Sequence, residues 1–149
     1  MRHSIMATLS DTGILSCIKA GELRIEPFAE PSLSSAGYDL RCGTAVAVPP
    51  GGHALIHTVE RLELCPSLCG QMFIRSSFAR EGAVGSFALV DPGFRGQLTL
   101  CIVNMGTKPL AINEGERVAQ IVFHRLETPS SEPYSGRYQG SVGTVESRR

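Results

Sequence analysis

The feature that most constrains the fold of this chain is a series of short runs in which apolar and polar residues alternate. Alternation with a period of two is typical of β-strands that bury one face. Proline, glycine and asparagine separate the runs, for example at residues 49–52 and 113–115, and they favour tight turns. The runs cover residues 38–41, 44–48, 53–59, 70–75, 86–90, 97–104, 109–112 and 117–124. This pattern predicts a mainly β protein, folded as a compact, distorted β-barrel or jelly roll.

One short helix is predicted before this β-rich region. Residues 10–11 are serine and aspartate, which cap helix N-termini, and apolar residues follow them at helical spacing. Gly21 then supplies the residue type that most often ends a helix. The pattern predicts a helix over about residues 11–20, followed by a strand over residues 22–26.

The length and charge of the chain limit what kind of protein it can be. Its 149 residues fit one domain with one good core. Lysine plus arginine and aspartate plus glutamate both number 14, so the formal net charge is zero. A protein that coats nucleic acid would be strongly basic, so no nucleic-acid partner is predicted, although a small phosphate pocket is compatible with this charge. No apolar run approaches the roughly 20 residues of a membrane span, and the N-terminus lacks a signal-peptide pattern.

The cysteines indicate a reduced, cytoplasmic protein without a structural metal. Their odd number and irregular spacing do not match a disulfide framework. Two of them, Cys65 and Cys69, are close in sequence, but no second pair or matching histidine pair completes a zinc site. Cys17, Cys42, Cys65, Cys69 and Cys101 are all predicted to be free thiols.

The composition divides the chain into two parts. Residues 1–127 carry the helix and all the strand patterns, and they are predicted to form the β-barrel domain. In residues 128–149 serine, proline, glycine and arginine dominate, which is typical of a flexible tail. Tyr134, Arg137 and Gln139 lie among glycines in this tail and could close over an anionic ligand. Both interpretations of the tail, as disordered or as a cover for a site, fit the composition.

The stretch over residues 75–104 concentrates the residues suited to chemistry. Asp91 is followed directly by proline and glycine, which places its carboxylate at the tip of a turn. Arg75 and Ser76 are hydrogen-bond donors suited to an anion, and Phe94 offers a flat apolar face. These residues suit nucleotide binding and activation of a water molecule. A β-hairpin with a polar tip and no chemistry is the alternative interpretation.

Six segments together resemble the dUTPase and dCTP deaminase superfamily. Residues 9–28 resemble the N-terminus of dCTP deaminases, and residues 137–140 resemble their C-terminal tail. The motifs between them are similar to motifs of both branches, in the family order. These central motifs lie at residues 35–41, 75–80, 90–96 and 115–123.

The resemblance implies a fold, an assembly and a cofactor. It implies a dUTPase-like (β-clip) barrel that forms a homotrimer with active sites shared between subunits. It implies deoxyuridine or deoxycytidine triphosphate as the substrate, with Mg²⁺ held mainly through the substrate's triphosphate rather than by metal ligands of the chain. It also implies that the tail covers the site of a neighbouring subunit.

The resemblance further implies a role for each site residue. Asp91 would be the general base that activates water, and Phe94 would stack under the deoxyribose and exclude a 2′-hydroxyl. Asp39 is predicted to be structural and to orient either Arg75 or the contact between subunits of the trimer. Residues predicted to bind phosphate or close over it are Arg75, Ser76, Ser77, Gln120, Tyr134, Arg137 and Gln139. Each role has an alternative: Asp91 could merely cap the turn, and Phe94 could be a core aromatic residue. The polar residues could be solvated or part of a structural hydrogen-bond network.

One position decides between the two branches of the superfamily. In dCTP deaminases a glutamate on the strand after the third motif transfers protons to and from the base, and its position falls on Cys101 here. A thiol differs from a carboxylate in protonation, reach and geometry. We therefore predict hydrolysis of dUTP to dUMP and pyrophosphate by Asp91-activated water. The alternatives are dCTP deamination, alone or coupled to hydrolysis in a bifunctional deaminase/dUTPase, and a non-catalytic nucleotide-binding regulator.

Overall fold

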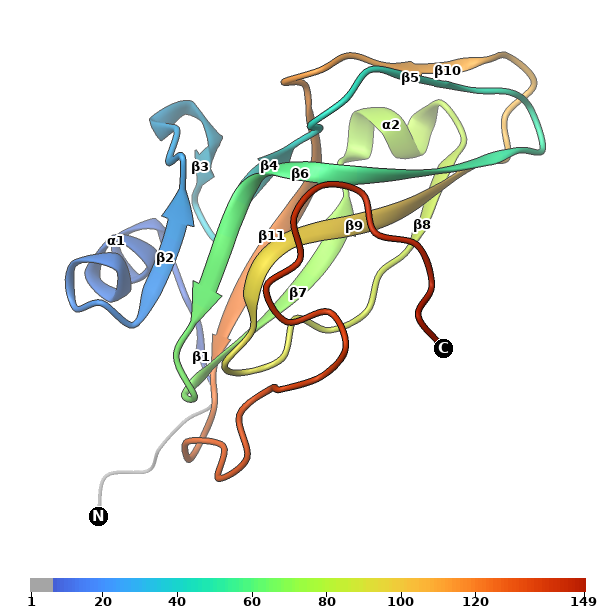
Figure 1. The fold of residues 1–149 in the computed structure, drawn as a ribbon. Coiled ribbons are helices and arrows are strands. Elements are labelled where there is room, and N and C mark those ends of the chain that lie inside the picture. Colours follow the sequence, from blue (N-terminus) through green and yellow to red (C-terminus); the bar gives the residue numbers. More distant parts are fainter. Residues whose placement is uncertain (1–6) are drawn as a thin grey trace.

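The computed structural model describes residues 7–149 and is built from antiparallel β-sheets (Figure 1). The largest sheet has β11 at its centre, paired with β7 on one side and with β4 and β1 on the other. Its strands are β1 (Ala7–Thr8), β3 (Leu33–Ser34), β4 (Gly37–Arg41), β7 (Leu68–Ile74) and β11 (Arg117–Arg125). The predicted mainly β fold is confirmed, although the sheets do not close into a barrel over the described residues.

A four-stranded sheet packs against this five-stranded sheet. A two-stranded sheet lies at one end of the four-stranded sheet (Figure 1). The four strands, in spatial order, are β2 (Leu23–Glu26), β6 (His53–Leu64), β9 (Arg95–Asn104) and β8 (Ala83–Ser86). The short strands β5 (Val46–Val48) and β10 (Leu110–Ile112) form the third sheet. Alternate residues of β6 are buried from Ile56 to Leu64, which is the period expected for a strand with one face on the core.

Two clusters of buried side chains form the core between these sheets. One includes Tyr38, Leu62 and Phe123 and lies beneath the helix α1 (Asp11–Lys19). Ser10 caps this helix by accepting a hydrogen bond from the Gly13 N–H, which confirms the predicted helix and its start. The second cluster includes Ile102 and lies between β9, the short strands and a second helix, α2 (Ser76–Arg80).

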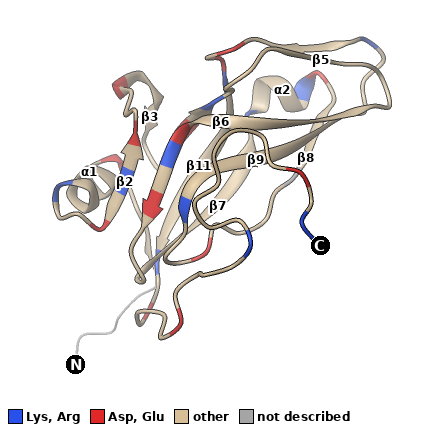
Figure 2. Ribbon diagram, in the orientation of Figure 1, with Lys and Arg blue, Asp and Glu red and all other residues tan. Residues whose placement is uncertain are grey.

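Residues of both charges lie along the strands (Figure 2), and some of them form salt bridges, as Arg24 does with Glu26 and Arg41 with Glu60. The fully buried carboxylate of Glu60 accepts a hydrogen bond of 2.6 Å from Arg41 Nε and another from the Arg41 N–H. Such a buried charge is tolerated only when its oxygens have partners. The five cysteines are free thiols. Over residues 7–149 no helix is long and apolar enough to cross a membrane.

The structure corrects two predictions of secondary structure. The polar residues after Ile74 form the helix α2, whereas the alternating pattern had suggested only strands in this region. The strand predicted over residues 86–90 is instead β8 at Ala83–Ser86, followed by a loop in which only Val90 makes a β-bridge. Both errors come from short segments, in which propensity is weak and tertiary packing decides. The predicted absence of a signal peptide concerns residues 1–6 in part, which lie outside the described residues.

Candidate functional site

The turn that carries Asp91 is fixed to the ends of two strands. Val90 exchanges both backbone hydrogen bonds with Gly70 of β7, at 2.8 and 2.9 Å. Gly93 has a φ of 85° and donates its N–H to Leu64 O, and Leu64 in turn donates to Phe94 O. A side chain at residue 93 would be disfavoured by that φ, so glycine is needed here. The result is an exposed carboxylate on a backbone held from both sides.

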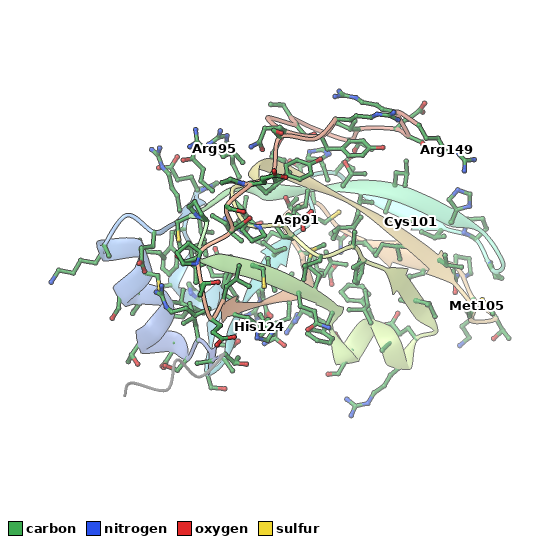
Figure 3. All side chains as sticks on the ribbon, turned by 90° about the horizontal axis from the view of Figure 1, so that it is seen from below. Asp91, Arg95, Cys101, Met105, His124 and Arg149 are labelled. Atoms are coloured by element: carbon green, nitrogen blue, oxygen red, sulfur yellow. The ribbon has the colours of Figure 1, made fainter. Side chains whose placement is uncertain are left out.

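Asp91 and Phe94 line a cavity of about 510 Å³ together with tail and β9 residues. The tail contributes Tyr134 on one side, and β9 contributes polar and sulfur-containing side chains on the other. Those from β9 include Gln97, Thr99 and Cys101. Figure 3 shows Asp91 and Cys101 beneath the C-terminal segment. The cavity is largely apolar with few polar groups, as small-molecule sites usually are.

Phe94 serves the core and the cavity at the same time. Its side chain is only 7% exposed and belongs to the core cluster that contains Tyr38. Its ring lies 5.8 Å from the Tyr134 ring, at 58°, a favourable tilted arrangement. The two interpretations offered by the sequence, core aromatic and ligand platform, are therefore compatible.

The Asp91 carboxylate also affects a neighbouring thiol. Burial raises the pKa of Cys69, and the negative charge of Asp91 raises that pKa further. Cys69 therefore stays protonated at neutral pH and is a poor nucleophile.

A second cluster of site residues forms around Asp39. Arg75 directly precedes α2, and its Nε lies 3.1 Å from Asp39 Oδ2, which confirms that Asp39 orients Arg75. Arg117 lies 3.7 Å from the same oxygen and accepts a hydrogen bond from Arg75 Nη1 at its carbonyl. Gln120 is paired in register with Asp39 and donates from Nε2 to Ser34 Oγ. Two guanidinium groups around one carboxylate leave a net positive charge, which suits an anion.

The predicted site residues thus fall into two groups within one chain. Arg75 follows one end of β7, while Asp91 follows the residue bridged to Gly70 near the other end. Gly70 and Arg75 are five positions apart along the chain, which is roughly 16 Å at about 3.3 Å per residue. Arg75, Ser76, Ser77 and Gln120 are absent from the lining of the Asp91 cavity.

The tail lies along the Asp91 turn of its own chain (Figures 1 and 3). Tyr134 donates its N–H to Pro92 O at 2.7 Å, and Gln97 donates to Ser141 O at 2.8 Å. The Gln139 side chain makes three hydrogen bonds to backbone groups, and the exposed Arg137 donates to Arg148 O. The resemblance predicts a tail that covers the site of a neighbouring subunit, and the contacts described here are those that the tail makes with its own chain.

Several residues at this site were not predicted from the sequence. Gln97 accepts a hydrogen bond from the Gly143 N–H, and Thr99 accepts one from the Val145 N–H, so both hold the tail. Their period-two spacing with Cys101 along β9 was the signal that could have found them. Glu146 also lines the cavity, and no pattern in the sequence marked it. Over residues 7–149 no group of three or more His, Cys, Asp or Glu side chains could hold a metal ion.

Solved structures with the same fold include both branches of the superfamily. A dCTP deaminase from Agrobacterium tumefaciens matches with a TM-score of 0.70 at 19% identity, over 80% of this chain and 48% of that one. A dUTPase of the virus EIAV matches with a TM-score of 0.62 at 21% identity, over 77% of this chain and 98% of that one. At such identities the likeness shows the fold alone.

Sequence comparison is more specific. A protein of Pyrococcus horikoshii named dCTP deaminase is 50% identical over 143 residues, which cover 86% of this chain and 92% of that protein. An Aquifex aeolicus protein named "dCTP deaminase, dUMP-forming" is 32% identical over 94% of this chain and 93% of that protein. The sequence model of the dCTP deaminase-like family matches residues 45–126. The chain therefore belongs to the dCTP deaminase-like family, within the superfamily that also contains the dUTPases.

Proposed function

We propose that this protein is an enzyme that converts a deoxypyrimidine nucleoside triphosphate in the cavity beside Asp91. The first candidate reaction is deamination of dCTP. One observation carries it: relatives that are 48–50% identical over 86% of the chain are named dCTP deaminases. Free thiols fit a cytoplasmic enzyme of this kind.

A specific feature of the cavity favours a second candidate, the hydrolysis of dUTP to dUMP and pyrophosphate. Cys101, which aligns with the deaminase glutamate, is ten residues after Asp91 and lines the same cavity. The thiol offers no carboxylate for proton transfer to the base. Asp91, by contrast, presents an exposed carboxylate that can accept a proton from water at the α-phosphate. A bifunctional enzyme would carry out both reactions, and the name of the Aquifex relative describes such an outcome.

The separation of the two residue groups supports a site that is shared between subunits. One chain places Asp91, Phe94 and Tyr134 at the cavity and keeps the arginine cluster around Asp39 roughly 16 Å away along β7. We propose that the Asp39–Arg75 cluster of a second copy meets the cavity and binds the phosphates, as expected for a homotrimer. Arg75, Ser76, Ser77 and Gln120 would then be phosphate ligands of the neighbouring site.

Magnesium would depend mainly on the substrate for its ligands. Three or more carboxylate, histidine or cysteine side chains never gather at one point within the described part of the chain. Mg²⁺ commonly keeps several waters and binds through substrate phosphates with one or two carboxylates, so this donor set is compatible with it. When bound, the ion would neutralise charge on the triphosphate and favour loss of pyrophosphate.

One assay separates these candidates. Purified protein is incubated with Mg²⁺ and each of dCTP, dUTP, dATP and dGTP, and ammonia and pyrophosphate are measured separately. Ammonia from dCTP identifies deamination, pyrophosphate from dUTP identifies hydrolysis, and both products from dCTP identify the bifunctional reaction. Saturable binding without either product would identify a non-catalytic nucleotide-binding regulator and would refute the enzymatic proposal.

A further inference from the structure

The side-chain amide of Gln139 forms hydrogen bonds with the backbone on both sides of Phe94. Its Oε1 accepts a hydrogen bond of 2.7 Å from the Arg95 N–H, and its Nε2 donates one of 2.8 Å to Gly93 O. Nε2 also donates to Tyr134 O at 3.0 Å. Thus one side chain holds the residues immediately before and after Phe94, and it holds Tyr134, whose ring contacts Phe94.

This arrangement requires an amide rather than any polar side chain of similar size. Two of the three contacts need a donor and the third needs an acceptor, and only the primary amides of asparagine and glutamine offer two N–H donors and an acceptor oxygen on one planar group. A flipped amide would face two carbonyl oxygens with its own oxygen, so the contacts also fix the orientation of the group. The neighbouring bond from Gly140 N to Arg95 O, of 2.8 Å, keeps Gln139 over the turn.

We infer that Gln139 is a positioning residue that sets the Phe94 ring and thereby the preference for deoxyribose over ribose. The inference rests on the proposed function and on the role that the family resemblance implies for Phe94, whose ring would lie under the sugar. It replaces direct phosphate binding as the main role of Gln139, because the amide uses its acceptor and both donors on the main chain. A displaced ring would exclude a 2′-hydroxyl less well, because such exclusion depends on close positioning.

The test compares Gln139→Glu and Gln139→Met with the wild type. Glutamate removes both donors and places a charge against two carbonyl oxygens, while methionine keeps the length without the hydrogen bonds. Val142→Ala is the matched control, since Val142 is a tail residue with 77% of its surface exposed. For whichever of dCTP or dUTP the wild type converts, kcat/KM is measured for that nucleotide and for its ribonucleotide. We expect the deoxy-to-ribo ratio to fall on the order of tenfold in both Gln139 variants and to stay unchanged in the control.

The possible results distinguish this inference from the alternatives. An equal loss of kcat/KM with both nucleotides would indicate phosphate binding and would overturn the inference. Equal turnover of the two nucleotides by the wild type would overturn it as well, while leaving the proposed reaction intact. Absence of any turnover would refute the proposed function, and amide hydrogen exchange would then decide the role of Gln139. Faster exchange of the backbone N–H groups of Arg95 and Tyr134 in Gln139→Met would support the positioning role of Gln139, and unchanged exchange would refute it.

Discussion

The carboxylate of Asp39 lies 3.1 Å from Arg75 Nε and 3.7 Å from Arg117 Nη1, and Asp39 is only 8% exposed. One buried carboxylate therefore sets the position of two cations, Arg75 just before α2 and Arg117 at the start of β11, that are 42 residues apart in sequence. Asp39 acts on the proposed phosphate site without being exposed enough to serve as a ligand itself.

The change Asp39→Asn is expected to weaken triphosphate binding. It removes the charge that holds Arg75 while keeping nearly the same shape, so the guanidinium loses its fixed orientation. We expect KM or Kd to rise on the order of tenfold, with kcat less affected, because the interaction with phosphate is lost in ground and transition state alike. Titration calorimetry and steady-state kinetics check this. Glu114→Gln, in an exposed turn, is the control, and an unchanged affinity in Asp39→Asn would contradict the assignment.

The change Asp91→Asn is expected to remove most turnover while the protein remains folded. The carboxylate is exposed and forms no salt bridge with any of residues 7–149, so its loss should leave the melting temperature nearly unchanged. Loss of a general base typically lowers the rate by about 10²–10⁴. Pyrophosphate release and circular dichroism are measured on the same preparation. Normal turnover in this variant would show that Asp91 only shapes the turn.

Truncation after Glu132 is expected to preserve the sheets and to abolish or strongly reduce turnover. The removed residues include Tyr134 and Gln139, which cover Phe94 and the Asp91 turn. Exposure of the Phe94 ring costs about 1.5–3 kcal/mol, and hydrogen bonds such as that from Tyr134 N–H to Pro92 O are also lost, so the melting temperature should fall by several degrees while the sheets persist. Collapse of the fold on truncation would instead identify the tail as a structural part of the domain. A full-length Val142→Ala variant controls for handling of the protein.

Cys101 tests the choice between the two reactions. Cys101→Glu places a carboxylate where dCTP deaminases carry their glutamate, and we expect the ratio of ammonia to pyrophosphate released from dCTP to rise above that of the wild type. Cys101→Ala should leave pyrophosphate release within about threefold, because the thiol has no role at the α-phosphate. If ammonia release by the wild type disappears in Cys101→Ala, the thiol itself takes part in deamination, and our account of the cavity is wrong.

The ion pair between Glu22 and Arg125 predicts a dependence of stability on pH. Arg125 Nη2 donates a hydrogen bond of 2.5 Å to Glu22, which lowers the pKa of that carboxyl below its ordinary value of 4.5. Because the pKa is lower in the folded state, the stabilisation is complete above about pH 5 and is lost as the pH falls through the lowered pKa. Urea unfolding should therefore show a difference between wild type and Glu22→Gln at pH 7 that shrinks toward about pH 3. Glu81→Gln, at an exposed position, is the control that removes a carboxylate elsewhere on the surface.

The sequence by itself determined most strands, the first helix and the membership of the family. Period-two alternation reports burial on one face of a strand, and the capping serine at residue 10 reports a helix start, so both are local properties. The turn at Asp91 was also readable, because proline fixes its own φ and glycine tolerates the positive φ that the turn requires at residue 93. The six motifs in family order then predicted what the comparisons with relatives confirmed.

Only the tertiary structure decided how the site residues are distributed. The pairing of β7 with β11 and the bridge from Gly70 to Val90 place Arg75 and Asp91 near opposite ends of one strand. The packing of the tail decided that Gln139 contacts the residues on both sides of Phe94, across 44 positions of sequence to Arg95. Such contacts depend on the register and approach of segments that are distant in sequence, and no local pattern encodes that geometry.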